Sequence, residues 1–208
     1  MFNSALGIIC DEHRSLAAVV QGLRHLVGEY RRDAMEPDFK LLRSIVFYLD
    51  EFPQKLHHPK EEIYLFAKLQ ERTRTADKVI AELQRQHLAG LRYVEDLHNT
   101  LAKYEIDRAA GLAAFSDSVE GFAIDILRHM ALEESALLPL ASRHLTGEDW
   151  VEIGLAFGKN GDPRFVADAD HAYAELFRRL INVAWPSGAE NHTGSKPGNG
   201  VAPDHGIF

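Results

Sequence analysis

Two copies of a short pattern, H-x-x-x-E-E, contain the residues of this chain that are best suited to chemistry. They occupy residues 57–62 and 129–134. Four residues make about one helical turn, so the His and the first Glu of each copy can share a helix face and act as paired metal ligands. One His precedes each copy, His13 by 44 residues and His87 by 42. The chain is therefore predicted to contain two related halves that each contribute two His and one Glu.

The segments around these residues have the apolar spacing of long bundle helices. Around His13, for example, Ile9, Leu16 and Val20 follow one another at intervals of threes and fours, which is typical of a helix with one buried stripe. Aligning the first and third helices on their lone His also aligns two of these apolar positions, which supports an internal repeat. The predicted helices cover about residues 4–33, from after residue 37 to 71–74, 75–104 and 109–144. The predicted fold class is all-α, an up-and-down four-helix bundle.

Prolines interrupt the second helix close to its ligand pair. A proline inside a helix lacks an N–H donor and clashes with the carbonyl four residues earlier. We therefore expect a kink near Pro53, with the helix resuming at or near Pro59. Pro139 is expected to bend the last turns of the fourth helix in the same way.

The candidate ligands occupy positions that Leu or Val would normally fill. A buried carboxylate without a partner costs several kcal/mol, and a buried imidazole costs less. A pair of divalent cations would satisfy the whole group, whereas separate hydrogen-bonded core histidines would be the simpler explanation for any one His alone. The predicted metal ligands are His13, His57, Glu61, His87, His129 and Glu133.

The types of these ligands narrow the choice of metal. Mixed imidazole and carboxylate ligation suits iron, manganese or zinc, and the single Cys10 excludes a cysteine-based structural zinc site. Glu61 and Glu133, one from each half, are placed to bridge two ions. Open positions would remain for a bridging oxo or hydroxo group and for an exogenous ligand. We predict two iron ions as the cofactor, with manganese or zinc as alternatives.

Other polar residues lie beside the ligand pairs. His58, Glu62 and Glu134 are predicted to be solvated helix residues, and a role in orienting the ligands is the alternative. His58 could also replace His57 as the ligand, although the alignment with residues 129–134 favours His57. Three further histidines are predicted to lie on the surface: His25, His98 and His144.

The C-terminal part is predicted to add helices to the bundle. Thr146 is a candidate N-cap for a short helix that carries Trp150, and a loop and a last helix at about 166–184 follow. The Gly- and Pro-rich residues from 185 onward are predicted to be disordered. The expected domains are thus a bundle at 1–145, C-terminal helices packed on it at 146–184, and a tail at 185–208.

Composition excludes several classes of partner and leaves the oligomeric state open. The formal net charge of -8 argues against nucleic acid. No stretch approaches about 18 uninterrupted apolar residues, so no membrane partner is expected. The lone cysteine and the charged residues near the N-terminus favour a cytoplasmic location.

The combined motifs resemble the hemerythrin-like HHE cation-binding family. The likeness lies in His13, the HHPKEE run at 57–62, His87 and the HMALEE run at 129–134, and it covers about residues 5–145. The resemblance implies an up-and-down four-helix bundle with a non-haem di-iron centre. Family roles include O2 binding, NO or peroxide chemistry, iron sensing and repair of iron–sulfur clusters. The implied partners are a small diatomic ligand or peroxide and a redox partner.

One departure from the oxygen carriers shapes the functional hypotheses. Those proteins have H-x-x-x-H on the third helix and five histidine ligands, whereas here Leu91 lies four residues after His87. This disfavours reversible oxygen carriage and favours an iron pair that reacts with O2 or peroxide. The leading hypothesis is a non-haem di-iron protein that binds or reacts with O2, peroxide or NO, as an enzyme or otherwise. An iron- or oxygen-responsive sensor without turnover is the second, and a metal-free helical interaction protein is the third.

Overall fold

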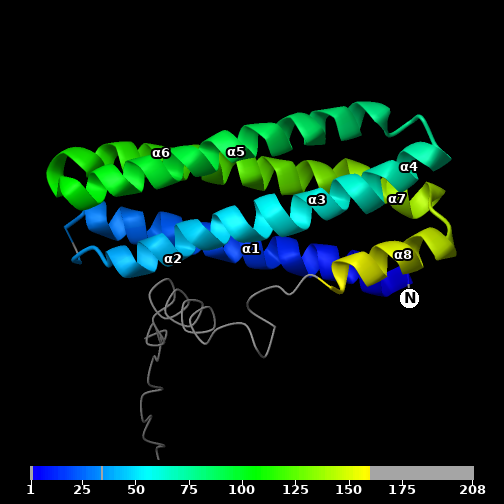
Figure 1. The fold of residues 1–208 in the computed structure, drawn as a ribbon, viewed down its shortest axis with the longest axis horizontal. Helices are drawn as coiled ribbons and strands as arrows, with labels where there is room; N and C mark the ends of the chain where they lie inside the picture. The colour runs from blue at the N-terminus through cyan, green and yellow to red at the C-terminus, as the bar shows by residue number, and fades with distance from the viewer. Residues whose placement is uncertain (1, 34, 160–208) are drawn as a thin grey trace, which may run out of the picture.

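The computed structural model describes residues 2–33 and 35–159, which form four antiparallel helical columns (Figure 1). The columns are α1 (Phe2–Arg31), a run from α2 (Phe39–Leu49) to α4 (Ala67–Arg72), α5 (Asp77–Ile106), and a run from α6 (Arg108–Leu132) to α7 (Leu138–His144). Contacts of α1 with α2, α2 with α5, α5 with α6 and α6 with α1 close the bundle. Within the described ranges there is no strand. The predicted all-α, up-and-down four-helix bundle is confirmed.

The second column stays helical through both of its internal prolines, but its α-helical hydrogen bonding stops at Leu49 and resumes at His58, next to Pro59, as predicted. The kink near Pro53 stays a prediction. The π-helix η1 (Asp50–His57) contains Pro53, the short α3 (His58–Lys60) contains Pro59, and the π-helix η2 (Glu61–Phe66) follows. The wider turn changes the hydrogen-bond register, as shown by the amide of His58, which donates to the carbonyl of Pro53 five residues earlier. Pro53 thus lies inside a π-segment and Pro59 in the first turn of α3, directly after that segment, so helical structure continues through both.

The fourth column also has a π-segment next to a proline. The π-helix η3 (Glu133–Leu137) lies directly before Pro139 in α7. A π-segment thus begins at the Glu of each H-x-x-x-E pair, at Glu61 in one half and at Glu133 in the other. Such turns often occur at functional sites in helices.

Capping residues set where the columns begin. The carboxylate of Asp38 accepts a hydrogen bond from the amide of Leu41, and that of Asp107 accepts one from the amide of Ala110. The turn between α5 and α6 is very close, because a Cβ at Gly111 would lie 2.4 Å from the Cα of Tyr104. A glycine at this position lets the two helices meet directly.

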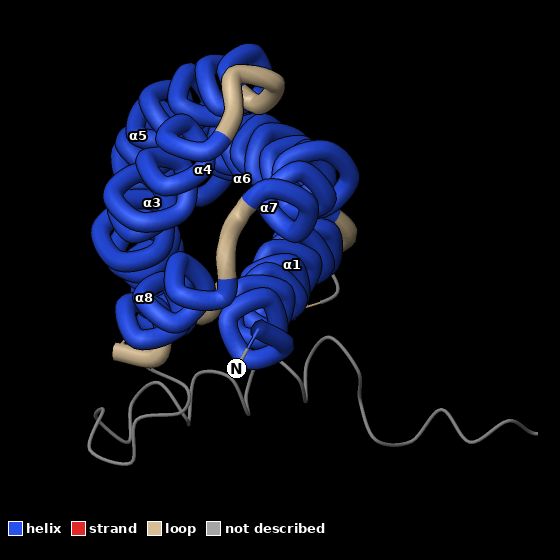
Figure 2. Tube along the Cα trace, turned by 90° about the vertical axis from the view of Figure 1, so that its right-hand side faces the viewer, coloured by secondary structure: helices blue, strands red, loops and turns tan. Residues whose placement is uncertain are grey.

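A further helix, α8 (Gly147–Phe157), lies along α1 at one end of the bundle (Figure 2). Thr146 caps it as predicted, in a capping box with Asp149. Asp149 also accepts two hydrogen bonds from the guanidinium of Arg72 in α4, each 2.9 Å long. The predicted helix at 166–184 and tail at 185–208 lie outside the described residues, and the proposed domain boundaries stay a prediction.

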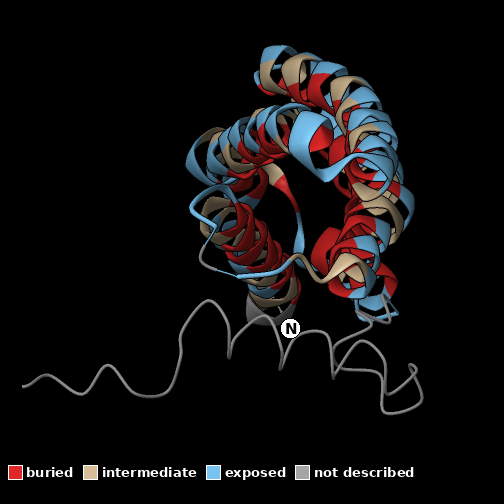
Figure 3. Ribbon diagram, turned by 90° about the vertical axis from the view of Figure 1, so that its left-hand side faces the viewer, coloured by how far each residue is buried: buried red, intermediate tan, exposed pale blue. Residues whose placement is uncertain are grey.

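Buried residues face the bundle axis along its whole length (Figure 3). They form two apolar clusters, one built mainly from α1, α2, α5 and α6 and the other from α8 together with the ends of the four columns next to it. A layer of buried polar side chains belongs to neither cluster. None of the helices in the described ranges has the length and apolar character that a membrane span requires.

Candidate metal centre

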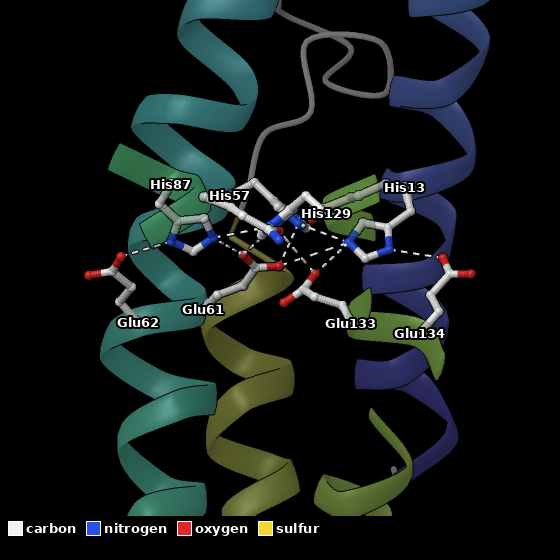
Figure 4. Close-up of polar contacts among 10 residues, drawn as sticks. His13, His57, Glu61, Glu62, His87, His129, Glu133 and Glu134 are labelled. Atoms are coloured by element: carbon white, nitrogen blue, oxygen red, sulfur yellow. Dashed lines mark hydrogen bonds and ion pairs between the residues drawn. The ribbon is translucent and has the colours of Figure 1, made fainter. Parts of the chain in front are cut away.

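The buried polar layer contains all six predicted metal ligands (Figure 4). Their side chains come from all four helical columns, and the most exposed of the residues is only 6% accessible. They are His13 from α1, His57 from η1, Glu61 from η2, His87 from α5, His129 from α6 and Glu133 from η3. The structure therefore brings together, out of solvent, every residue that the two sequence motifs singled out.

One group of ligand atoms lies between α1 and the second and fourth columns. It consists of His13, His57, Glu61 and Glu133, whose ligand atoms all lie within 4.8 Å of one another. Nε2 of His13 is 3.2 Å from Nε2 of His57 and 3.1 Å from Oε2 of Glu133, while Nε2 of His57 is 2.7 Å from Oε1 of Glu61. These separations suit one ion with metal–ligand distances of about 2.0–2.3 Å.

A second group lies on the α5 side of the same layer. It consists of His58, Glu61, His87 and His129, again with ligand atoms within 4.8 Å of one another. Nε2 of His87 is 3.2 Å from Oε2 of Glu61 and 3.3 Å from Nε2 of His129. Glu61 belongs to both groups, with Oε1 near His57 and Oε2 near His87. That is the arrangement of a carboxylate that bridges two ions.

His58 is the site residue that the sequence argument placed wrongly. It was expected to be solvated or to replace His57, but it is buried and its ring stacks on that of His87 with centroids 4.1 Å apart. Adjacent helix residues point in different directions, so His57 faces the first group while His58 faces the second. The adjacent pair of histidines was the signal, and its two members lie in different candidate ligand groups rather than being alternatives for one position.

Several buried polar atoms of this layer have no hydrogen-bond partner among the described residues. They are both carboxylate oxygens of Glu61, both of Glu133, and both ring nitrogens of His58. Although Nε2 of His57 approaches Oε1 of Glu61 to 2.7 Å, the two are not aligned as a hydrogen bond. Buried polar atoms are normally satisfied, so six such atoms around two points indicate missing partners. Divalent cations fit this donor set.

The outer ring nitrogens of the two upstream histidines are held by carboxylates from the opposite half. Nδ1 of His13 donates to Oε1 of Glu134 at 2.9 Å, and Nδ1 of His87 donates to Oε1 of Glu62 at 2.8 Å. Figure 4 shows these two pairs at opposite sides of the layer. Because a carboxylate only accepts, each Nδ1 carries the proton and each Nε2 keeps its lone pair for the centre. Glu62 and Glu134 are exposed, as expected, and each also contacts a candidate ligand histidine, which agrees with the alternative of a role in orienting the ligands.

The histidines of the H-x-x-x-E pairs are held in a related way. Nδ1 of His57 donates to Glu12 at 2.7 Å, and Nδ1 of His129 donates to Oε1 of Gln86 at 3.2 Å. The amide nitrogen of Gln86 donates to Glu82, which fixes its oxygen toward His129. Glu12 and Gln86 each directly precede the upstream His of their half, so the second ring of contacts repeats as the ligands do.

The two central carboxyl groups affect each other strongly. Burial, together with the negative charge of Glu61, raises the pKa of Glu133 to about 7. Burial acts on Glu61 in the same direction, but His57 and neighbouring histidines outweigh it and hold the pKa of Glu61 well below its ordinary value. In the absence of a cation, Glu133 therefore binds a proton more readily than an ordinary carboxyl group does, while Glu61 does not. A divalent cation would take the place of that proton.

Comparison with known proteins agrees with this architecture. The family model described as the hemerythrin HHE cation-binding domain matches residues 4–141, which include every residue of both ligand groups. A search of curated proteins and a search of solved structures gave no match to this chain. Since the family model covers well over half of the sequence, this chain belongs to the hemerythrin HHE cation-binding family.

Proposed function

We propose that this protein is a non-haem di-iron protein that binds or reacts with O2, peroxide or NO. The observation that carries the proposal is the set of six buried, unpartnered ligand atoms on Glu61, Glu133 and His58. One ion would be held by His13, His57, Glu61 and Glu133, and the other by His58, Glu61, His87 and His129. Glu61 would bridge the ions. A bridging role for Glu133 stays a prediction, since its Oε2 is 3.8 Å from Nε2 of His129.

Ligand chemistry fits iron, manganese or zinc, and among these the proposed chemistry favours iron. Five imidazoles and two carboxylates form a donor set that iron, manganese and zinc all accept, whereas softer or harder metals prefer thiolates or an all-oxygen shell. When bound, iron supplies the change of oxidation state and the open coordination positions that O2, NO or peroxide chemistry requires. His58 also restores a count of five histidines, so the loss of a ligand at Leu91 no longer argues for an unsaturated pair.

The chain's own residues would prepare the site rather than perform the redox step. Glu12, Glu62, Glu134 and Gln86 fix the ring orientation and tautomer of four histidines. Phe157 of α8 packs edge-on against His57, with centroids 5.8 Å apart, and helps to exclude water from the first group. An ion bound here would thus meet ligands that are already oriented, which lowers the cost of binding.

An iron-responsive sensor without turnover is the second candidate. It is favoured by the raised pKa of Glu133, because a cation would compete with a proton for this buried carboxyl group and binding would depend on pH. Metal binding and folding stability are coupled in such a core. A sensor would show a large shift in stability with iron and no catalytic loss of peroxide, whereas a reactive site would consume peroxide repeatedly.

The test is anaerobic iron loading followed by measurement of iron per chain and of visible spectra before and after O2, NO or peroxide. Two ions per chain and new charge-transfer bands are expected. His129→Ala should abolish loading of the two ions. His25 has a side chain that is 40% exposed and lies outside both groups, so His25→Ala should leave loading unchanged. Far fewer than two ions per chain in the clean protein would reject the site. A cytoplasmic location and a redox partner remain predictions.

A further inference from the structure

A pocket of about 420 Å³ lies between α1 and α6, outside the buried polar layer. Its lining comes from residues 21–31 of α1 and 116–120 of α6, and no residue of either candidate ligand group takes part. Even Gln21, the first of these residues in α1, follows His13 by eight residues, or about 12 Å of helix rise. Small-molecule sites have volumes of about 300–1,000 Å³. The pocket is therefore large enough for a ligand and separate from the candidate metal centre.

Two arginines line this pocket, and their charges are used differently. The guanidinium of Arg24 donates to the two carboxylate oxygens of Glu120, at 2.9 and 2.7 Å, and to Oε1 of Gln21 at 3.3 Å. Arg31 makes no ion pair within the described ranges, where the one hydrogen bond of its side chain is a long one of 3.4 Å to Oγ of Ser116. The charges of Arg24 and Glu120 thus offset each other, whereas the guanidinium of Arg31 is available to an anion.

Two further hydrogen-bond donors line the same pocket. Ser116 is only 9% exposed, and because its oxygen accepts from Arg31, its own hydroxyl hydrogen remains available. The side-chain oxygen of Gln21 accepts from Arg24, which leaves the amide nitrogen of Gln21 to donate. A guanidinium fork, a hydroxyl and an amide suit a group with several acceptor oxygens, and a phosphate monoester offers three.

A glycine leaves space beside Arg31. Side chains of a helix lean toward its N-terminus, so Arg31 extends back over Gly28, three residues earlier. Outside the backbone of its own helix, a Cβ at Gly28 would meet only Nη2 of Arg32, at an ordinary contact distance of 3.9 Å. Packing therefore does not exclude a side chain here, although glycine in a helix interior is less favourable than alanine. The missing side chain instead contributes to the open volume of the pocket, which Gly28 lines.

The internal repeat shows that these features belong to one half of the bundle. Eighteen residues after the upstream His, the first half has Arg31, whereas the second has Glu105, which forms an ion pair with Arg43 of α2. Fifteen residues after it, Gly28 corresponds to Ala102. The equivalent positions therefore supply neither an unpaired arginine nor a glycine. In a chain with a net charge of -8, the available arginine at this pocket is a local feature that composition does not explain.

We propose that this pocket binds a small organic phosphate, whose phosphate group is held by Arg31, Ser116 and Gln21. The planar guanidinium of arginine matches phosphate oxygens in pairs, which gives direction as well as charge to the contact. Val27 and Val119 also line the pocket and supply apolar surface for the organic part of the ligand. The inference does not depend on metal, so it stands or falls separately from the proposed function.

The first test is calorimetric titration of the full-length chain with phenyl phosphate at constant ionic strength, with and without iron. Saturable binding of one molecule is expected, with the same affinity in both forms. Arg31→Gln should weaken it at least about tenfold, because a charged hydrogen-bonding partner is lost. Arg74→Gln removes the same charge from a side chain that is 85% exposed and outside the pocket, and should have no effect. No saturable binding, equal loss in both variants, or binding that requires iron would overturn the proposal.

The second test fills the pocket. Gly28→Leu adds a side chain where packing permits one, and should weaken binding of phenyl phosphate at least about tenfold without loss of helix content by circular dichroism. Gly7→Leu is the matched control in the same helix, at a position where no atom lies within 4 Å of the added Cβ and outside the pocket. Unchanged binding in a folded Gly28→Leu protein rejects the location.

Two further titrations test the chemical class of the ligand. Glu120→Gln removes the carboxylate that lines the pocket and releases Arg24, so it should strengthen binding of phenyl phosphate by at least about threefold. Benzoate has the same ring and a carboxylate in place of the phosphate, and should bind at least about tenfold more weakly to the unaltered protein. Weaker binding in Glu120→Gln, or benzoate binding as tight as that of phenyl phosphate, would reject a phosphate site.

Discussion

The two halves of the bundle build nearly the same site from different surroundings. In each, an upstream His donates to the second Glu of the opposite copy, and the residue before that His holds the His of its own copy's pair. The halves differ at three places. The position of His58 is taken by Met130 in the other half, and that of Glu12 is taken by Gln86. In addition, Phe157 of α8 packs against the first group. The repeat accounts for the two groups of candidate ligands, and the differences give each group its own environment.

The strongest way to break this comparison is to remove the residue that both groups share. Glu61→Ala should take iron loading from two ions per chain to near zero, because each group loses a ligand and the bridge is gone. Metal analysis after anaerobic loading measures the result, with helix content by circular dichroism as the check on folding. Because Glu61 also pairs with His57 and His87 in the metal-free core, this variant should be less stable, so retained helix content is required before the metal result is read. Retention of two ions would contradict the bridging role.

Making the halves alike at the extra histidine should affect one ion only. His58→Met gives the second group the residue type found at Met130, and should weaken the second ion by at least about tenfold while the first remains. Iron stoichiometry at increasing chelator concentration separates the two ions. Met130→Leu is the control, since Met130 belongs to neither group. Equal loss of both ions, or of neither, would show that His58 does not distinguish them.

The sequence predicted the inner ligands because each interrupts an apolar stripe at a helical interval. His13, His87 and Glu133 could be recognised one helix at a time, and the repeat combined them. The roles of Glu62 and Glu134 could not be recognised in this way. Each is partly exposed on its own helix and becomes important only where a histidine from the opposite half reaches it. Such a contact depends on how the columns pack, which periodicity does not specify.

The prolines likewise show what the sequence cannot predict about the backbone. Local chemistry correctly marks Pro53, Pro59 and Pro139 as unable to continue a regular α-helix. It does not say whether the helix breaks or widens. Packing of the flanking residues in the bundle core keeps both columns continuous, and π-turns absorb the mismatch. Two of these π-segments begin at the proposed ligands Glu61 and Glu133, so the structural adjustment lies at the candidate site.

A smaller effect on metal affinity is expected when the residues that hold His57 and His129 are made alike in the two halves. Glu12→Gln replaces the carboxylate that holds His57 with the amide that holds His129 in the other half. A neutral acceptor makes the ring a weaker ligand, so affinity for the first ion should fall by about tenfold. Competition with a coloured chelator would measure this. Gln86→Glu is the reciprocal change and should strengthen the second ion; a fall in its affinity would argue that charge at this position is not what separates the halves.

The least effect on metal should come from loosening α8, the element that covers only the first group. Asp149→Asn weakens both the cap at Thr146 and the paired hydrogen bonds from Arg72, and should lower the free energy of unfolding by about 1–2 kcal/mol. The hydrogen bonds from Arg72 hold the pKa of the Asp149 carboxyl well below its ordinary value. A lowered pKa means that this stabilisation is complete above the ordinary carboxyl range and is lost as the pH falls below about 4. The difference in unfolding free energy between the two proteins, measured by urea unfolding, should therefore be constant near neutral pH and shrink in acid.

Iron stoichiometry should stay at two, because α8 supplies no ligand to either group. Loss of the first ion alone would show that the packing of α8 over the first group is also required to hold that ion.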